Sequence, residues 1–292
     1  MIGPSTSPPL DLETIRRLVR AALDEDGATH DLTTAAVVPA DQSGRAAFVL
    51  REPGVLCGLA LAREAFHALD PALRWQPLRI DGDPVAAGET VAEVFGCLSP
   101  ILQAERVALN FLQRLSGIAT LTRQATARIE HTSARLLDTR KTTPGLRLLE
   151  RYAVRVGGGH NHRFNLAAGI LIKDNHIAAV RARGGALTDA VRRAIASAGP
   201  ATGVEVEVTS IAELEEALAA GARAVLLDNM PPDVLRKAAQ IAHDHGALTE
   251  ASGGITVETL AAIAATGVDY ISMGALTHSA RALDIALEVE PA

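Results

Sequence analysis

The stretch VEVEVTSIAELEEALAAGARAVLLDN, residues 204–229, decides the fold class. It opens with a short run of Val and Glu, continues with a helical pattern and ends in a second apolar run closed by Asp228. The next units follow at the same interval, because 22 residues separate Asp228 from Glu250 and 22 more lead to Ser272. A strand and crossover helix that repeat at roughly 20–25 residues are typical of a parallel β/α barrel or a doubly wound sheet.

Polar residues follow the apolar runs, and this placement favours the barrel. Active sites of β/α barrels are built at the carboxyl ends of several strands, whereas a doubly wound sheet gathers its ligand residues at one crevice. The sequence also lacks a GxGxxG after the first strand and a GxxxxGK[ST] anywhere. We therefore expect an incomplete (β/α) barrel of fewer than eight strands with an N-terminal α+β domain. Its predicted strands lie in the runs 134–138, 169–174, 204–208, 224–229, 247–250 and 269–274.

Changes of pattern along the chain predict the domain limits. A Pro- and Ser-rich tail at 1–9 is expected to be disordered, and an α+β domain is expected over 10–115. The barrel is expected over 116–276. The last segment, 277–292, is expected to be a helix that returns to the N-terminal domain.

Composition excludes several classes of function. The 292 residues carry a net charge of −6 and only 3% aromatic side chains, which argues against nucleic-acid binding. The N-terminus lacks a signal-peptide pattern, and no apolar run is long enough to span a membrane. The two cysteines provide no disulfide framework. We expect a cytoplasmic protein.

Residues 136–177 concentrate positive charge near successive predicted strand ends. Such a group of cations on a net-acidic chain predicts a small substrate with several negative charges. The HxH at 160–162 is also compatible with a zinc pair, although no third ligand follows at a fixed spacing. The basic residues of the segment include Arg140, Lys141, His160, His162, Arg163, Lys173 and His176.

Acidic residues occupy the later strands. Glu205 and Glu207 share one face of their strand, and Asp228 ends the next. These carboxylates suit Mg²⁺ held partly through water, ribose hydroxyls, or ion pairs with the basic segment.

Two glycine-containing loops, SGG at 252–254 and GALTHS at 274–279, follow the last two predicted strands. Such loops are recurrent phosphate sites in barrels. Since no Ser-His-Asp set is evident, the residues indicate a transfer reaction that depends on positioning and charge neutralisation.

Nearly the whole chain resembles the quinolinate phosphoribosyltransferase family, also called nicotinate-nucleotide pyrophosphorylase (carboxylating). The segments that carry this resemblance include EDGATHDLTT (25–34), ERVALNFLQRLSGIAT (105–120), LLDTRKTTPGLRLLERYAV (136–154), GGGHNHR (157–163), LIKDNHI (171–177), EASGG (250–254) and GVDYISMGALTHS (267–279). The resemblance implies a homodimeric glycosyltransferase with shared active sites. In that family quinolinate and 5-phosphoribosyl-1-pyrophosphate react with Mg²⁺ to give nicotinate mononucleotide, pyrophosphate and CO₂ in NAD biosynthesis.

The resemblance also implies roles for individual residues. Arg140, His162, Arg163 and Lys173 would hold the two carboxylates of quinolinate, with Arg106 supplied by the partner subunit. Lys141 would lie between the substrates, and Glu207 and Asp228 would bind the ribose and the metal. The remaining implied contacts, to the 5-phosphate or elsewhere on the substrates, are Thr139, Ser252, Gly253, Gly254, Met273, Gly274, Ala275 and His278.

Asn165 and Ala168 depart from the family pattern, which has Gly and Asp there. Three alternatives remain open. One is a related barrel for another pyridine or aromatic acid, which would be expected to lose one of the cations. The second is a Schiff-base aldolase with Lys141 or Lys173 as nucleophile, and the third is a non-catalytic sensor.

Overall fold

The computed structural model describes residues 8 and 10–292. The tail predicted at 1–9 therefore lies almost wholly outside the described residues. Two compact units emerge from the contacts, and each gathers separate stretches of chain. The N-terminal unit contains residues 8–123, 148–158 and 280–292, and the barrel unit contains 124–147 and 159–279. Both units are discontinuous along the chain. The domain limits predicted from the sequence stay a prediction.

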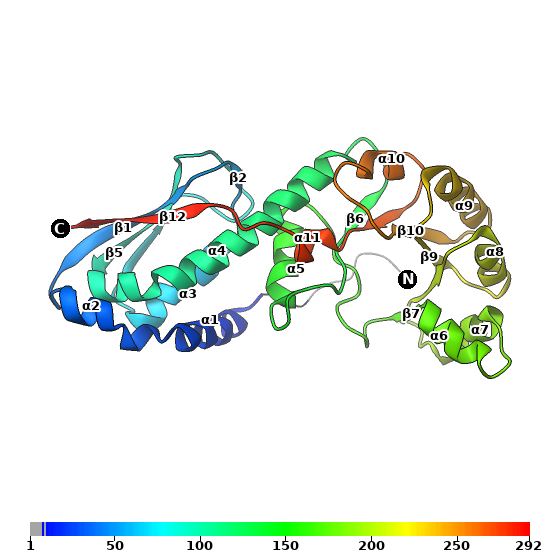
Figure 1. The fold of residues 1–292 in the computed structure, drawn as a ribbon, viewed down its shortest axis with the longest axis horizontal. Coiled ribbons are helices and arrows are strands. Elements are labelled where there is room, and N and C mark those ends of the chain that lie inside the picture. Colours follow the sequence, from blue (N-terminus) through cyan, green and yellow to red (C-terminus); the bar gives the residue numbers. More distant parts are fainter. Residues whose placement is uncertain (1–7, 9) are drawn as a thin grey trace. The chain divides into compact units, whose positions relative to one another are not determined.

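The N-terminal unit combines an antiparallel sheet with helices (Figure 1). Four of its strands pair in the order β12-β1-β5-β3, and β2 pairs with β4. The unit includes most of α4 and α5. Its elements are α1 (Leu12–Asp26), a short 3-10 turn (Ala28–His30), α2 (Leu32–Val37), β1 (Ser43–Leu50), β2 (Gly54–Val55), α3 (Leu59–Leu69), β3 (Arg74–Pro77), β4 (Pro84–Val85), β5 (Thr90–Cys97), α4 (Leu98–Ala127), α5 (Arg147–Val156) and β12 (Ile285–Pro291).

Helix α1 illustrates how sequence signals set an element in this unit. Asp11 caps its start by accepting the Thr14 N–H at 2.8 Å, and Gly27 ends it with a φ of 65°. Between these caps Ile15, Val19 and Leu23 recur every four residues and are buried. This single apolar stripe gives α1 one buried face.

The helix predicted for 277–292 is wrong. Only Ala275–His278 is helical, and Ile285–Pro291 forms β12 instead. In the sequence LEVEP the apolar Leu287 and Val289 alternate with glutamates, and a period of two is the pattern of a strand. The strand pairs antiparallel with β1, with Leu287 opposite Phe48.

The barrel unit contains six parallel strands in the order β6-β11-β10-β9-β8-β7. An open sheet of six parallel strands with helices α8 and α9 on its outer side confirms the incomplete barrel (Figure 1). Its elements are β6 (Arg135–Leu137), β7 (Ile170–Ile172), α6 (Asp174–Arg181), α7 (Leu187–Ser197), β8 (Val204–Val208), α8 (Ile211–Ala219), β9 (Ala224–Asp228), α9 (Pro232–Asp244), β10 (Leu248–Ser252), α10 (Leu260–Ala264), β11 (Tyr270–Ser272) and α11 (Ala275–His278).

Burial explains the Val and Leu residues of β8 and β9. Val206, Val208, Val225 and Leu227 are fully buried in the core of the barrel unit. Strands of a parallel sheet are covered on both faces, which favours Val and Leu throughout. Polar side chains are therefore concentrated where the strands end. Among the described residues, no helix is both long and apolar enough to cross a membrane.

Candidate active site

The segment 159–163 occupies the free edge of β6, the first strand of the open barrel. His160 forms a parallel bridge with Leu137, its N–H donates to the Leu136 carbonyl at 2.8 Å, and its carbonyl accepts the Asp138 N–H at 3.0 Å. The pairing is too short to make a seventh strand. It nevertheless delivers the basic residues of GGGHNHR to the carboxyl end of β6.

Asp138 secures this arrangement, although sequence reasoning gave it no role. Its carboxylate is completely buried just beyond β6. One oxygen accepts the His162 backbone N–H at 2.8 Å, and the other accepts the Asn161 side-chain amide at 2.5 Å. The signal available in the sequence was a lone Asp closing an apolar strand in LLDTRK.

Arg140 and Arg163 form a cationic pair in this region. Burial and the nearby charge of Arg140 lower the pKa of Arg163, while Glu205 opposes the shift. Among the described residues, the buried Nε atom of Arg140 has no hydrogen-bond partner. Arg147 braces both segments by donating to the carbonyls of Arg140 at 3.4 Å and Phe164 at 3.3 Å. Two close cations with an unused donor suit an anion that carries more than one charge.

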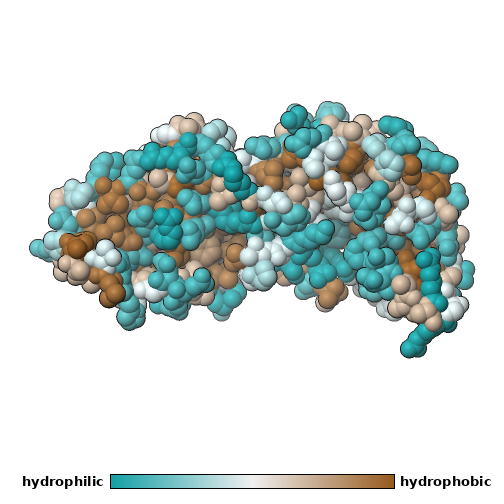
Figure 2. Space-filling view, viewed as in Figure 1, coloured by the Kyte–Doolittle hydropathy of each residue, from teal (hydrophilic) through white to brown (hydrophobic). Residues whose placement is uncertain are grey.

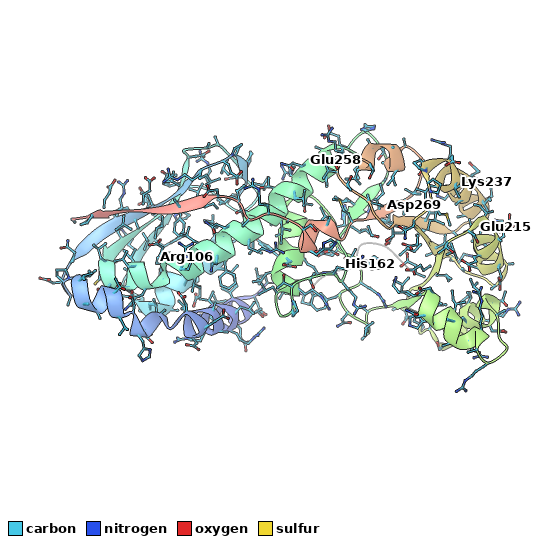
Figure 3. The ribbon with its side chains drawn as sticks, viewed as in Figure 1. Arg106, His162, Glu215, Lys237, Glu258 and Asp269 are labelled. Carbon is cyan, nitrogen blue, oxygen red and sulfur yellow. The ribbon has the colours of Figure 1, made fainter. Side chains whose placement is uncertain are left out.

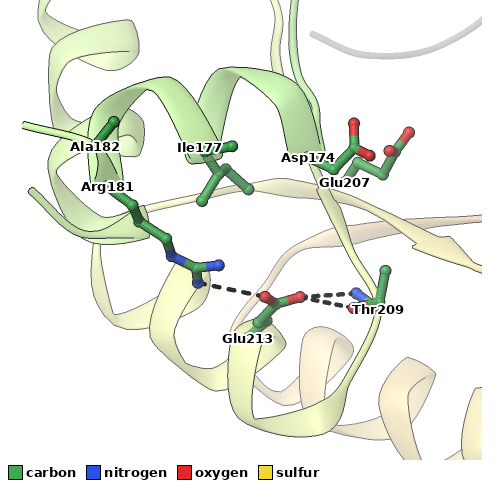
Figure 4. A pocket seen from close by; sticks show the side chains of 8 residues that line it. Asp174, Ile177, Arg181, Ala182, Glu207, Thr209 and Glu213 are labelled. Carbon is green, nitrogen blue, oxygen red and sulfur yellow. Dashed lines mark hydrogen bonds and ion pairs between the residues drawn. The ribbon is translucent and has the colours of Figure 1, made fainter.

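The carboxylate ends of β8 and β9 face different partners. Glu207 forms an ion pair with Lys173, which follows β7. The Asp228 carboxylate, at the end of β9, accepts the Asn229 side-chain amide at 2.7 Å. Glu207 also borders a cavity of about 370 Å³ that Asp174 and residues of α6 and α8 help to line (Figure 4). The ion pair between Glu207 and Lys173 agrees with the interpretation that these carboxylates pair with the basic segment.

Glu205 and Glu207 lie two residues apart on β8, but their side chains differ in depth and in partner. Glu205 is 2% exposed and Glu250, on β10, is 1% exposed. His162, labelled within the barrel unit in Figure 3, places its Nε2 atom 3.5 Å from Glu205 Oε2 and 3.2 Å from Glu250 Oε2. Burial tends to lower the pKa of His162, but the hydrogen bonding and charge of the two carboxylates raise it overall. Burial and the charge of Glu250 raise the pKa of Glu205.

These three side chains are also the one His, Cys, Asp and Glu group in the described chain whose ligand atoms lie close enough for a metal ion. A histidine that binds a metal through one ring nitrogen donates a hydrogen from the other. Here His162 Nδ1 instead accepts the Arg163 backbone N–H at 2.7 Å. A neutral His162 ring in this contact carries its hydrogen on Nε2, which argues against a zinc site that includes the HxH motif.

In each of the two glycine loops, side chains of other residues lie close to the backbone of a glycine. A Cβ atom at Gly253 would lie 2.3 Å from the Asn229 side-chain oxygen, and the residue has a φ of +95°. A Cβ atom at Gly274 would lie 3.0 Å from Lys141 Cδ and 3.2 Å from the His278 ring. Glycine therefore brings Lys141 and His278 close together. The Lys141 carbonyl also accepts the Thr277 hydroxyl at 2.7 Å.

The other predicted contacts are less concentrated. Thr139 accepts the Lys141 N–H at 3.1 Å, Met273 is buried, Ala275 begins α11, and Ser252 and Gly254 lie in the SGG loop. His176 accepts the Lys173 N–H at 2.9 Å at the start of α6. Asn165 and Ala168 are exposed. Arg106 is an exposed residue of α4 in the N-terminal unit, so the structure of one chain does not group it with the others (Figure 3).

Comparisons with known proteins agree on one family. The model of the quinolinate phosphoribosyl transferase N-terminal domain matches residues 31–116, and that of the C-terminal domain matches 118–288. A probable nicotinate-nucleotide pyrophosphorylase [carboxylating] of Bacillus subtilis (strain 168) is 46% identical over 94% of this chain and 93% of its own. The chloroplastic enzyme of Oryza sativa subsp. japonica is 39% identical over 99% of this chain and 80% of its own.

Solved structures give the same result. The nicotinate-nucleotide pyrophosphorylase from Francisella tularensis matches with a TM-score of 0.90 and 40% identity, covering 98% of this chain and 100% of its own. NadC from Streptococcus pyogenes matches with a TM-score of 0.91, the same identity and the same coverage. These similarities extend across both units.

We expect Asp138→Ala to destabilise the barrel unit by on the order of 3 kcal/mol, because two buried donors lose their acceptor. Urea unfolding monitored by circular dichroism measures this change. Asp244→Ala is the matched control, since that exposed carboxylate accepts only from the Gln240 side chain among the hydrogen bonds observed. Equal stability of the two variants would contradict the anchoring role of Asp138.

Proposed function

Because the chain belongs to the quinolinate phosphoribosyltransferase family, we propose that it transfers the phosphoribosyl group of 5-phosphoribosyl-1-pyrophosphate to quinolinate, with loss of pyrophosphate and CO₂. The product is nicotinate mononucleotide, an intermediate of de novo NAD biosynthesis. The observation that carries the proposal is the pair Arg140 and Arg163, in which Arg140 Nε has no hydrogen-bond partner among the described residues. Quinolinate has two adjacent carboxylates, and a planar guanidinium can bind each of them through parallel hydrogen bonds.

Lys173 extends this cationic group from the end of β7. Its ammonium can contact a substrate carboxylate while Glu207 limits its motion. Lys141 is exposed and Lys173 is paired with a carboxylate, so neither occupies the apolar pocket expected of a Schiff-base lysine. This difference favours phosphoribosyl transfer over the aldolase alternative.

The other strand ends suit the phosphoribosyl group. Glu207 and Asp228 offer carboxylates to the ribose hydroxyls and can stabilise positive charge that develops on the sugar. The SGG loop with Ser252 and the loop of Gly274 and His278 offer backbone N–H groups and a ring to the 5-phosphate. Lys141, close to Gly274, would lie between the two substrates.

The reaction needs positioning more than acid–base catalysis. The pyridine nitrogen forms a bond to C1 of the ribose while the C1–oxygen bond breaks and pyrophosphate leaves with that electron pair. The positively charged ring then accepts the electrons of the adjacent C–CO₂ bond, and a proton from water replaces the lost CO₂. Arg140 and Arg163 hold the carboxylates so that the nitrogen faces the sugar.

We further propose that Mg²⁺ takes part. Glu207 and Asp228 supply carboxylate oxygens, the donors that Mg²⁺ prefers, and both are only partly buried, which leaves space for its water ligands. Bound there, the ion would offset negative charge on the pyrophosphate.

The assembly proposed is a homodimer in which Arg106 of one subunit contributes to the site of the other. Its support is the exposed position of Arg106 and the apolar surface of the N-terminal unit. Figure 2 shows apolar side chains in that unit, where Leu32 is 85% and Val37 70% exposed on α2. A cytoplasmic location stays a prediction.

Purified protein should release CO₂ from carboxyl-labelled quinolinate only with 5-phosphoribosyl-1-pyrophosphate present, and nicotinate should be inert. Arg140→Gln should lower kcat/KM for quinolinate by about 10- to 100-fold, the value of one lost charge-assisted contact. Arg236→Gln, at an exposed position on α9, is the matched control. A folded protein that binds both substrates without CO₂ release would instead support the sensor alternative.

Chelation of divalent ions should abolish activity, and Mg²⁺ should restore it. We expect Asp228→Asn to raise the Mg²⁺ concentration for half-maximal activity about tenfold, since one charged ligand is lost. Asp244→Asn should leave it unchanged. Full activity in the presence of excess chelator would refute the metal proposal.

Arg106→Ala and Lys141→Ala should each be inactive alone but active when mixed. Random exchange into dimers would restore about a quarter of the wild-type sites, because each mixed dimer has one site free of both substitutions. Activity is measured after exchange has been confirmed by native mass spectrometry. Mixed dimers without activity would show that Arg106 does not act in the partner's site.

A further inference from the structure

Asn229 follows β9 with an unusual backbone conformation. Its φ of 55° makes it the one residue other than glycine with a positive φ in the described chain. Such a conformation costs free energy for most side chains, and glycine is the residue that adopts it most easily. The chain nevertheless carries an asparagine here, directly after Asp228. A side chain kept at such a position beside a carboxylate of the site points to a use for that side chain.

The Asn229 side chain is bonded to the neighbouring carboxylate. Its Nδ2 atom donates to Asp228 Oδ2 at 2.7 Å. An ionised carboxylate can only accept, so the amide nitrogen must face Asp228 and the amide oxygen must face away from it. The bond restricts rotation of the carboxylate, and it leaves Asp228 Oδ1 without a hydrogen bond among the described residues. Oδ1 is therefore the oxygen that can accept a ribose hydroxyl.

The other side of the Asn229 amide packs against the SGG loop. A Cβ atom added to Gly253 would overlap the Asn229 side chain, and the amide oxygen would be its nearest neighbour. Gly253 has a φ of +95° and Gly254 one of +60°, so this loop also leaves its strand in the left-handed region. The amide of Asn229 thus lies between the Asp228 carboxylate and the backbone of Gly253.

Backbone pairing supports the same arrangement. Asp228 and Ser252 are partners in the register of β9 and β10. The Asn229 N–H donates to the Ser252 carbonyl at 2.9 Å, which extends the pairing by one bond beyond Asp228. Asn229 therefore contacts the SGG segment through both its backbone and its side chain, while its amide holds Asp228. It joins the carboxylate to the loop.

We propose that Asn229 is a positioning residue for the phosphoribosyl donor, because its amide sets the Asp228 carboxylate at a fixed place relative to the SGG loop. The ribose hydroxyls and the 5-phosphate of one molecule then meet the carboxylate and the loop together. This inference rests on the proposed function for its substrate. A carboxylate that is free to rotate must be ordered when the sugar binds, which lowers affinity. Quinolinate, held by Arg140 and Arg163, does not depend on this contact.

Ribose 5-phosphate tests the proposal, because it carries the sugar hydroxyls and the phosphate but no pyrophosphate. Calorimetry without quinolinate or Mg²⁺ should give a Kd about tenfold higher for Asn229→Gly than for wild type, the value of one weakened hydrogen bond to a charged group. Inorganic phosphate reaches only the loop and should bind both proteins within about twofold. Glycine tolerates the positive φ, so the thermal midpoint of the variant should stay within about 3 °C of wild type.

Asn229→Asp separates hydrogen-bond donation from packing. Aspartate has the shape of asparagine and tolerates the same φ, but its carboxylate cannot donate to Asp228 and repels it. We expect it to lose at least as much affinity for ribose 5-phosphate as Asn229→Gly. Gln240→Glu is the matched control, since the exposed Gln240 amide donates to Asp244 at 2.8 Å and undergoes the same chemical change. This control should bind ribose 5-phosphate like wild type.

In the complete reaction, Asn229→Gly should raise the KM for 5-phosphoribosyl-1-pyrophosphate about tenfold and change the KM for quinolinate less than about twofold. Wild-type affinity for ribose 5-phosphate in both Asn229 variants, or an equal loss of affinity for inorganic phosphate, would overturn the proposal. Wild-type protein that binds ribose 5-phosphate no better than inorganic phosphate would overturn it too. Wild-type protein that releases no CO₂, but binds ribose 5-phosphate more tightly than Asn229→Gly does, would count against the proposed function alone.

Discussion

The buried carboxylate of Asp138 is the constraint on which the site depends. An open six-stranded barrel leaves β6 without a neighbour on one side, and the segment 159–163 occupies that edge. The pairing is brief, so its backbone contacts alone hold it weakly. Asp138 adds hydrogen bonds to Asn161 and His162 from a fully buried position. These contacts hold the segment that carries Arg163 at the open edge of β6, near Arg140.

Positive and negative side chains lie at different depths within the barrel unit. Arg140 and Arg163 lie near the strand ends, and Glu205 and Glu250 lie buried in its interior with His162. The buried carboxylates lower the cost of holding two arginines together, and a dianionic substrate would lower it further. A monoanion such as nicotinate would compensate less of that charge. Discrimination between the two acids can thus follow from electrostatics without a general base.

Much of this fold could be predicted from the sequence, and the exceptions have physical causes. Each of the six barrel strands overlaps one of the predicted runs, because strands covered on both faces are rich in Val, Leu and Ile. The C-terminal strand was missed because the alternation in LEVEP is short and β12 is completed only by its distant partner β1. Alternation placed Glu205 and Glu207 on one face but could not show their depth. As a result their different partners, His162 and Lys173, were not predictable.

Some of the site residues could likewise be predicted from the sequence, and others could not. The cations were evident from their density, whereas Asp138 stands out only once its hydrogen bonds to a segment more than 20 residues away are seen. Asn229 was likewise overlooked. It is the one residue other than glycine with positive φ in the described chain, and it packs where Gly253 has no side chain. The proposed contribution of Arg106 depends on a second subunit and stays a prediction.

The most direct test of this account is a crystal structure of the protein with quinolinate bound. We expect the two carboxylates of quinolinate to contact the guanidinium groups of Arg140 and Arg163 at about 2.7–2.9 Å. Quinolinate bound away from both arginines would contradict the central claim that this cationic pair recognises the dianion.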